Sequence, residues 1–109
     1  MNHFTDRKGH DAIRAVSPWR FRARRQRGRQ PFGAYFTTLE LSAPNFFQKV
    51  RIPVRKRRFM FRFVDVGDLL PFPGPRDLLP FPGPRGLYVL YSPTDYFVAK
   101  PRQQYEGPA

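Results

Sequence analysis

Residues 58–66 alternate between phenylalanine and other side chains, and this pattern constrains the fold more than any other stretch of the sequence. Alternation with a period of two is typical of a β-strand that is buried on one face. The predicted strand directs three phenylalanines to the same face: Phe59, Phe61 and Phe63. Such a face needs a hydrophobic surface opposite it, so the chain must build a sheet that packs against further elements. We expect these three side chains to lie in the core.

The size and composition of the chain predict one domain, residues 1–109. A chain of 109 residues has room for one core, and its hydrophobic residues, 40% of the total, are enough to fill a modest one. The sequence has no cysteine, which excludes a disulfide framework and a thiolate metal site. Because His3 and His10 are its only histidines, we also expect no zinc site.

The remaining patterns predict an α+β domain with two short helices. Thr5 and Asp6 can cap the first helix, and Ser42 can cap the second. His10 falls on the expected polar side of the first helix. The expected helices cover residues 5–16 and 44–50, and the expected strands cover residues 19–24, 33–41, 58–66, 86–92 and 95–100. We expect the tail, residues 101–109, to be loose.

A tandem repeat occupies residues 68–85. Residues 68–76 read Asp-Leu-Leu-Pro-Phe-Pro-Gly-Pro-Arg, and residues 77–85 repeat them without a change. The prolines lack the N–H group that a helix or a central strand needs. We therefore expect a Pro-rich, extended surface loop. A polyproline ligand for an aromatic groove is the alternative interpretation of this segment.

The positive charge of the chain is concentrated in its first part. The formal net charge is +12, and residues 1–63 hold 16 Lys and Arg against 3 acids, whereas residues 64–109 hold 4 against 5. This imbalance favours one basic face that meets a polyanion. No apolar stretch approaches the roughly 20 residues that span a membrane, and no signal-peptide core is visible. We expect a soluble protein, either cytoplasmic or delivered as an effector without a signal peptide.

Three short motifs occur in an informative order. Residues 3–5 are His-Phe-Thr, residues 33–37 are Gly-Ala-Tyr-Phe-Thr, and residues 95–98 are Asp-Tyr-Phe-Val on a late predicted strand. This order resembles the H-Y-[E/D] organisation of ADP-ribosyltransferases. It is most similar to the small toxin domains with an H-Y-D signature, whose pattern opens with His-Tyr-Thr and continues with Gly-x-Tyr-[Phe/Leu]-Thr. The third motif is similar to the Glu-Tyr-[Ile/Phe]-Val strand of poly(ADP-ribose) polymerases.

The resemblance implies a small ADP-ribosyltransferase-like fold with a split antiparallel β-sheet core, and a toxin-like enzyme that transfers ADP-ribose from NAD to a macromolecular target. Cleaving the nicotinamide–ribose bond develops positive charge on the ribose, which a carboxylate stabilises. By resemblance, Asp95 is that carboxylate, His3 holds the ribose and Tyr35 stacks on the nicotinamide. The backbone of Phe4 pairs with the nicotinamide amide, and Thr5 supports His3.

Several assignments stay open within this interpretation. Arg20 and Arg22 are expected at the pyrophosphate on electrostatic grounds, because guanidinium groups bind phosphate as forked donors. The acid can also be Asp65, Asp68 or Glu40. The target is unspecified, and the basic half of the chain also suits an acidic immunity protein.

A second interpretation is a small basic nucleic-acid-binding protein without enzymatic activity. Its arginines alternate with aromatic rings that can stack on bases: Trp19, Phe21, Phe59 and Phe61. A third interpretation is an inactive copy or a fragment, because only two residues precede His3.

Overall fold

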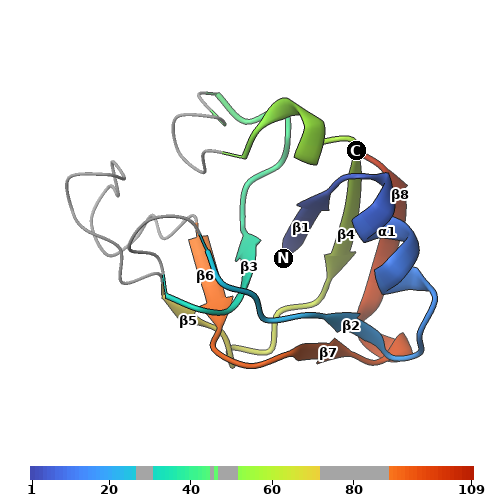
Figure 1. The fold of residues 1–109 in the computed structure, drawn as a ribbon, viewed down its shortest axis with the longest axis vertical. Coiled ribbons are helices and arrows are strands. Elements are labelled where there is room, and N and C mark those ends of the chain that lie inside the picture. Colours follow the sequence, from blue (N-terminus) through green and yellow to red (C-terminus); the bar gives the residue numbers. More distant parts are fainter. Residues whose placement is uncertain (27–30, 45, 47–51, 72–88) are drawn as a thin grey trace.

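The computed structural model describes residues 1–26, 31–44, 46, 52–71 and 89–109. These residues form an α+β domain with a six-stranded sheet, a two-stranded sheet and one α-helix (Figure 1). In chain order the elements are β1 (Asn2–Thr5), α1 (Arg7–Arg14), β2 (Trp19–Phe21), β3 (Ala34–Thr37), the 3-10 helix η1 (Val54–Lys56), β4 (Phe59–Phe63), β5 (Leu70–Pro71), β6 (Val89–Ser92), β7 (Tyr96–Val98), the 3-10 helix η2 (Lys100–Arg102) and β8 (Gln103–Pro108).

The larger sheet is antiparallel and has the order β5-β6-β3-β1-β4-β8. β1 lies inside this sheet although it is the first strand of the chain. On one side it pairs with β4, which in turn pairs with the last strand, β8. β2 and β7 form the smaller sheet, also antiparallel. Strands that are distant in the sequence therefore become neighbours throughout the fold.

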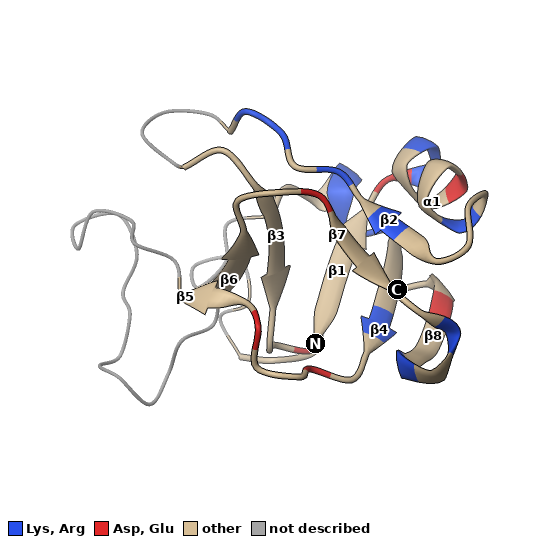
Figure 2. Ribbon diagram, turned by 90° about the horizontal axis from the view of Figure 1, so that it is seen from below, with Lys and Arg blue, Asp and Glu red and all other residues tan. Residues whose placement is uncertain are grey.

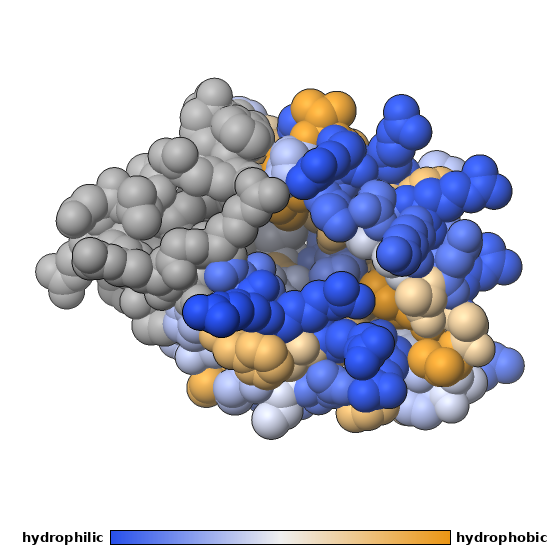
Figure 3. Space-filling model, viewed as in Figure 1, coloured by the Kyte–Doolittle hydropathy of each residue, from blue (hydrophilic) through white to orange (hydrophobic). Residues whose placement is uncertain are grey.

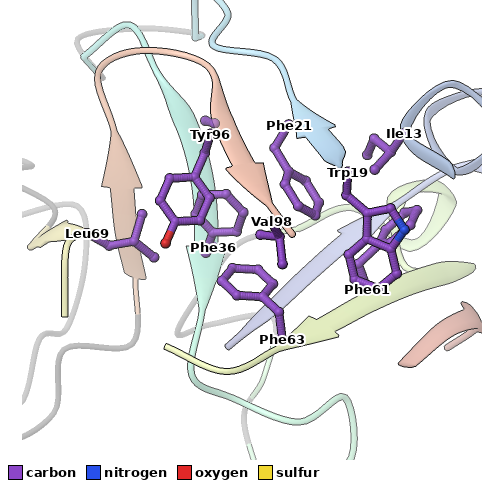
Figure 4. Close-up of a cluster of buried hydrophobic side chains, with 10 residues drawn as sticks. Ile13, Trp19, Phe21, Phe36, Phe61, Phe63, Leu69, Tyr96 and Val98 are labelled. Atoms are coloured by element: carbon purple, nitrogen blue, oxygen red, sulfur yellow. The ribbon is translucent and has the colours of Figure 1, made fainter. Parts of the chain in front are cut away.

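The main core lies between the two sheets. Phe61 and Phe63 of β4 are completely buried, and rings from both sheets meet them edge-to-face or tilted (Figure 4). The Phe21 ring centroid lies 5.5 Å from that of Phe61 and 5.2 Å from that of Phe36. The cluster also contains Ile13, Trp19, Ala34, Leu69, Tyr96 and Val98. The core role predicted for Phe61 and Phe63 is thus confirmed, whereas Phe59 is partly exposed.

The opposite face of the larger sheet carries a second, smaller cluster. Phe4 of β1 and Met60 of β4 are buried there with Phe46. Leu39 and Ile52 pack against them. The central strands are therefore covered on both faces at this point, which explains why Met60 is buried although it alternates with arginines.

Helix α1 confirms the first predicted helix over a shorter range, Arg7–Arg14. The Asp6 side chain caps it by accepting a hydrogen bond from the Gly9 N–H at 2.8 Å. The second predicted helix, residues 44–50, lies mostly outside the described residues.

The polar position predicted for His10 is wrong. His10 is buried, its ring stacks on Phe59 with centroids 4.6 Å apart, and its Nε2 atom lies 2.5 Å from Oε2 of Glu106. Glu106 belongs to β8, 96 residues further along the chain. Local periodicity carries no information about such a distant partner.

The loose tail predicted for residues 101–109 is also wrong. Residues 103–108 form β8, which pairs with β4, and the Ala109 N–H donates to the Arg58 carbonyl at 2.9 Å. Most side chains of β8 are exposed, because the strand lies at a sheet edge and is held chiefly through its backbone. An exposed edge strand has little hydrophobic pattern from which it could be predicted.

The start of the Pro-rich repeat joins the larger sheet. β5 (Leu70–Pro71) pairs with β6 at the edge of the sheet, where a proline is tolerated because its missing N–H faces no neighbouring strand. Leu69, just before it, is buried in the main core. Residues 72–85 of the predicted loop lie outside the described residues. No helix among the described residues is long and apolar enough to cross a bilayer.

Gly9 lies so close to β1 that a larger residue does not fit. A Cβ atom at this position would lie 2.0 Å from Oγ1 of Thr5. Alanine favours a helix by about 1 kcal/mol over glycine, but overpacking costs about 1–3 kcal/mol. We expect Gly9→Ala to lower the melting temperature by about 5 °C, measured by circular dichroism. Lys8→Ala, at an exposed position of the same helix, is the control and should melt like the wild type. A Gly9→Ala variant that is at least as stable as the wild type would contradict this packing.

Candidate active site

β1 and β3 are neighbours that pair at only one position, Asn2 with Thr37, whereas β1 and β4 pair at four. Beyond that position the backbone ladder does not continue. Instead, the carbonyl of Tyr35 on β3 accepts a hydrogen bond from Nδ1 of the His3 ring at 2.9 Å. We call this place, formed by His3, Phe4 and Tyr35, the β1–β3 split. In the same orientation as Figure 1, the molecular surface has a hollow near the middle of the view, and hydrophilic side chains form part of its border (Figure 3).

The backbone of Phe4 is directed toward the split. In an antiparallel ladder, alternate residues turn their N–H and C=O groups to opposite neighbours. Met1 exchanges hydrogen bonds with Phe63 of β4, so every second residue from Met1 faces β4. The backbone N–H and C=O groups of Phe4 therefore point toward β3. No residue of β3 pairs with Phe4, because the pairing of the two strands ends at Asn2. These two backbone groups match the two hydrogen-bonding groups of a carboxamide.

The His3 ring is held as a neutral hydrogen-bond acceptor. It is half-buried against Phe21 and Phe36, with ring centroids 4.9 and 5.6 Å away. Burial first, and then the charges of Lys56 and Arg24, lower the pKa of His3 to about 4, although the hydrogen bond to the Tyr35 carbonyl opposes this shift. A carbonyl can only accept, so Nδ1 carries the hydrogen and Nε2 keeps its lone pair. No group of the described residues is hydrogen-bonded to Nε2.

Arg24 and Lys56 lie beside the split and were not singled out by the sequence. Arg24 exchanges two backbone hydrogen bonds with Gly33, both 3.0 Å long, directly before β3. Lys56 of η1 reaches Oδ2 of Asp6 with its Nζ at 2.8 Å. Their charges contribute to the lowered pKa of His3, so both lie in its neighbourhood. In the sequence, Arg24 is one of three arginines that alternate with other residues after Trp19, and nothing distinguished it from the other two. No sequence pattern indicated Lys56.

Asp95 is an ionised carboxylate held at the start of β7. Its Oδ1 accepts from the Ala23 N–H at 2.8 Å, and its Oδ2 binds Arg20, with Nε at 2.8 Å and Nη2 at 2.6 Å. These contacts, the Ala23 N–H first, lower the pKa of Asp95. Ala23 is followed by Arg24, so one short segment connects the carboxylate with the split. No described contact joins Asp95 directly to His3.

The Tyr35 ring does not face His3. Phe36, the next residue of β3, enters the main core on the side where His3 lies, so Tyr35 projects from the other face of the sheet. There it stacks on Tyr91 with ring centroids 5.5 Å apart, and its hydroxyl donates to the Pro31 carbonyl at 2.6 Å. Burial raises the pKa of Tyr35 to about 12. His3 and Tyr35 thus meet through the Tyr35 backbone.

The other predicted site residues take the following places. Thr5 is buried, and no described hydrogen bond joins its side chain to His3. Arg20 and Arg22 gather near Asp95: Arg20 binds it, and the charge of Arg22 contributes to the lowered pKa of the carboxyl. Arg20 and Arg22 therefore lie near the Asp95 carboxylate, whereas the cations near the split are Arg24 and Lys56.

The three alternative acids each have their own partner. Glu40 pairs with Arg62 at 2.5 Å, Asp68 accepts from the Tyr96 hydroxyl at 2.6 Å, and Asp65 accepts from the Gly67 N–H at 2.9 Å. None of them contacts His3 in the described structure. Within the described ranges, no three metal-ligating side chains gather.

The base-stacking role predicted for Trp19, Phe21 and Phe61 is wrong. All three rings are buried in the main core, where they hold the two sheets together. Phe59 is covered on one face by the His10 ring. Trp19, Phe21 and Phe61 therefore cannot meet a nucleobase while the protein is folded, and Phe59 has one face covered.

The neutral state of His3 makes stability depend on pH in a definite window. The unfolded chain takes up a proton at this residue near pH 6.5, the folded protein only near pH 4. The free energy of unfolding must therefore fall as the pH drops from 6.5 to 4, by about 2–3 kcal/mol for this group. We measure the free energy of unfolding in urea at pH 7.5 and at pH 4.5. In His3→Gln we expect the difference between these two values to be smaller than in the wild type by the contribution of His3. An equal difference in wild type and variant would show that His3 titrates normally.

Comparison of the chain with known protein families, with curated proteins and with solved structures finds no match.

Proposed function

We propose that this protein is a toxin-like mono-ADP-ribosyltransferase, which cleaves NAD at the nicotinamide–ribose bond and transfers ADP-ribose to a macromolecular target. The observation that carries the proposal is the contact of His3 with the Tyr35 carbonyl in the β1–β3 split. It leaves a neutral ring with an accepting Nε2 atom on the first strand of the sheet. The order of the His3, Tyr35 and Asp95 motifs along the chain, together with the antiparallel sheet, supports the same proposal.

The groups around the split suit the separate parts of NAD. A ribose hydroxyl can donate to Nε2 of His3, because a neutral imidazole accepts at that atom. The nicotinamide carboxamide can pair with the N–H and C=O of Phe4, which face the split. Arg24 and Lys56, which lie near His3, can meet the pyrophosphate. We assign the pyrophosphate to these two cations instead of Arg20 and Arg22, because Arg24 and Lys56 are the cations that act on His3; Lys56 also pairs with Asp6.

The proposed reaction needs a carboxylate that stays charged. The bond between ribose and nicotinamide breaks, its electron pair leaves with the nicotinamide, and positive charge develops on the ribose. Asp95 stabilises this charge, since the Ala23 N–H and Arg20 keep its carboxyl ionised. A nucleophile of the target then attacks the same ribose carbon and gives up its proton. The products are nicotinamide, the modified target and a proton.

Tyr35 enters the proposal through its carbonyl, which orients His3. Its ring is stacked on Tyr91 on the other face of the sheet. The packing of this ring therefore lends no support to the expected stacking on nicotinamide. In the proposed site Tyr35 is a positioning residue.

The proposal is tested by measuring nicotinamide released from NAD by the purified protein. We expect release by the wild type and a loss of about 100-fold or more in Asp95→Asn, because one electrostatic stabiliser of the transition state contributes about that much. The amide oxygen of asparagine can still accept from the Ala23 N–H, so the local backbone is preserved.

Matched variants of the other acids separate the candidates for the carboxylate. Glu40→Gln, Asp65→Asn and Asp68→Asn should retain the release of nicotinamide. A loss confined to one of these three would transfer the role to that residue. A folded wild-type protein that neither binds NAD in calorimetry nor releases nicotinamide would overturn the proposed function.

A further inference from the structure

The two-stranded sheet has one face in the core and one face turned outward. Along β2 and β7, buried side chains alternate with exposed ones. The outward positions Arg20 and Phe97 lie directly opposite each other in the register. Phe97 is 52% exposed although it is a phenylalanine in the middle of a strand. We call the outward side of β2 and β7, with Arg20, Arg22 and Phe97, the ribbon face.

Three exposed cations without an acidic partner among the described residues lie in the segments that follow β2 and β7. Asp95 is the one acid within residues 15–26 and 93–102, and Arg20 binds it. Arg22, Arg25 and Lys100 are exposed and form no ion pair with any residue that the structure describes. Figure 2 shows the basic residues along β2 and the chain that follows it, next to the start of β7. The ribbon face thus combines a flat apolar ring with unneutralised positive charge.

We propose that the ribbon face binds single-stranded nucleic acid, with a base stacked on Phe97 and phosphates bound by Arg22 and its basic neighbours. A phenyl ring offers a flat surface on which any base can stack, and arginines bind phosphate oxygens. The strand must be single, because the bases of a duplex cover one another's faces. Of the rings that the sequence had favoured for this role, Trp19, Phe21 and Phe61 are buried and Phe59 is covered on one face by His10, whereas Phe97 is accessible.

The composition of the ribbon face favours nucleic acid over an acidic protein. A stable protein interface needs a desolvated apolar centre that several large side chains build together. The ribbon face has one large apolar side chain, Phe97; the other outward position within β2 and β7 is Arg20, which binds Asp95, and Arg22 follows directly after β2. One ring among cations suits a partner that offers one flat base at a time along a charged backbone.

The test is fluorescence anisotropy with labelled oligothymidylate of about 20 nucleotides, without NAD, across a range of salt concentrations. We expect wild-type binding to weaken steeply with salt, because bound phosphates release counterions. Phe97→Ala should weaken binding about 10-fold without changing the slope of the salt dependence. Arg22→Gln should reduce that slope by about 0.7, the amount expected for one phosphate contact to a single strand. Both positions are exposed, so the fold should be retained, which circular dichroism checks.

Arg55→Gln is the matched control, since it removes one exposed positive charge from η1, away from β2 and β7, and should bind like the wild type (Figure 1). Wild-type affinity in Phe97→Ala, or duplex DNA binding as tightly as the single strand, would overturn the proposal. Polyglutamate that displaces the oligonucleotide at equal charge concentration would instead identify a surface for acidic protein. Because NAD is absent, none of these outcomes depends on the proposed enzymatic activity.

Discussion

The packing of Phe61 and Phe63 between the two sheets is the interaction on which the rest of the structure depends. Both side chains are excluded from solvent, and rings from β2, β3 and β7 converge on them. The hydrophobic area that they bury fixes the distance and orientation of the smaller sheet over the larger one. Since Asp95 and Arg24 extend from the ends of the smaller sheet, their positions relative to β1 follow from this aromatic contact. A core of rings thereby determines where the charges of the candidate site lie.

The place of β1 between β3 and β4 explains the electrostatics of the candidate site. β4 pairs with β1 along its whole length, but β3 pairs with it at one position, so the backbone ladder opens on one side only. At this opening the Tyr35 carbonyl accepts a hydrogen bond from Nδ1 of the His3 ring instead of from a backbone N–H group of β1. A charged imidazole would be unfavourable there, because the ring is half-buried between aromatic residues and Lys56 and Arg24 lie near it. The protonation state of His3 is thus a consequence of the sheet's irregularity.

The sequence was informative wherever a local pattern decides the structure. The alternation around Phe61 predicted β4, Asp6 predicted the start of α1, and the aromatic segment around Tyr35 predicted β3. It failed where the deciding contact is distant in the chain. The burial of His10 depends on Glu106, and β8 depends on the backbone edge of β4. For the site, the motifs pointed to His3 and Asp95, but no pattern placed the Tyr35 ring on the other face or Lys56 beside His3.

The position of β8 also bears on the exposure of a sheet edge. β4 pairs with β1 on one side, and among the described residues its other side is paired only by residues 103–108. Without these residues, β4 would present an open edge of backbone N–H and C=O groups. Open edges of this kind template pairing with other chains. The pairing of β8 with β4 therefore covers an edge that would otherwise be open to strands of other chains.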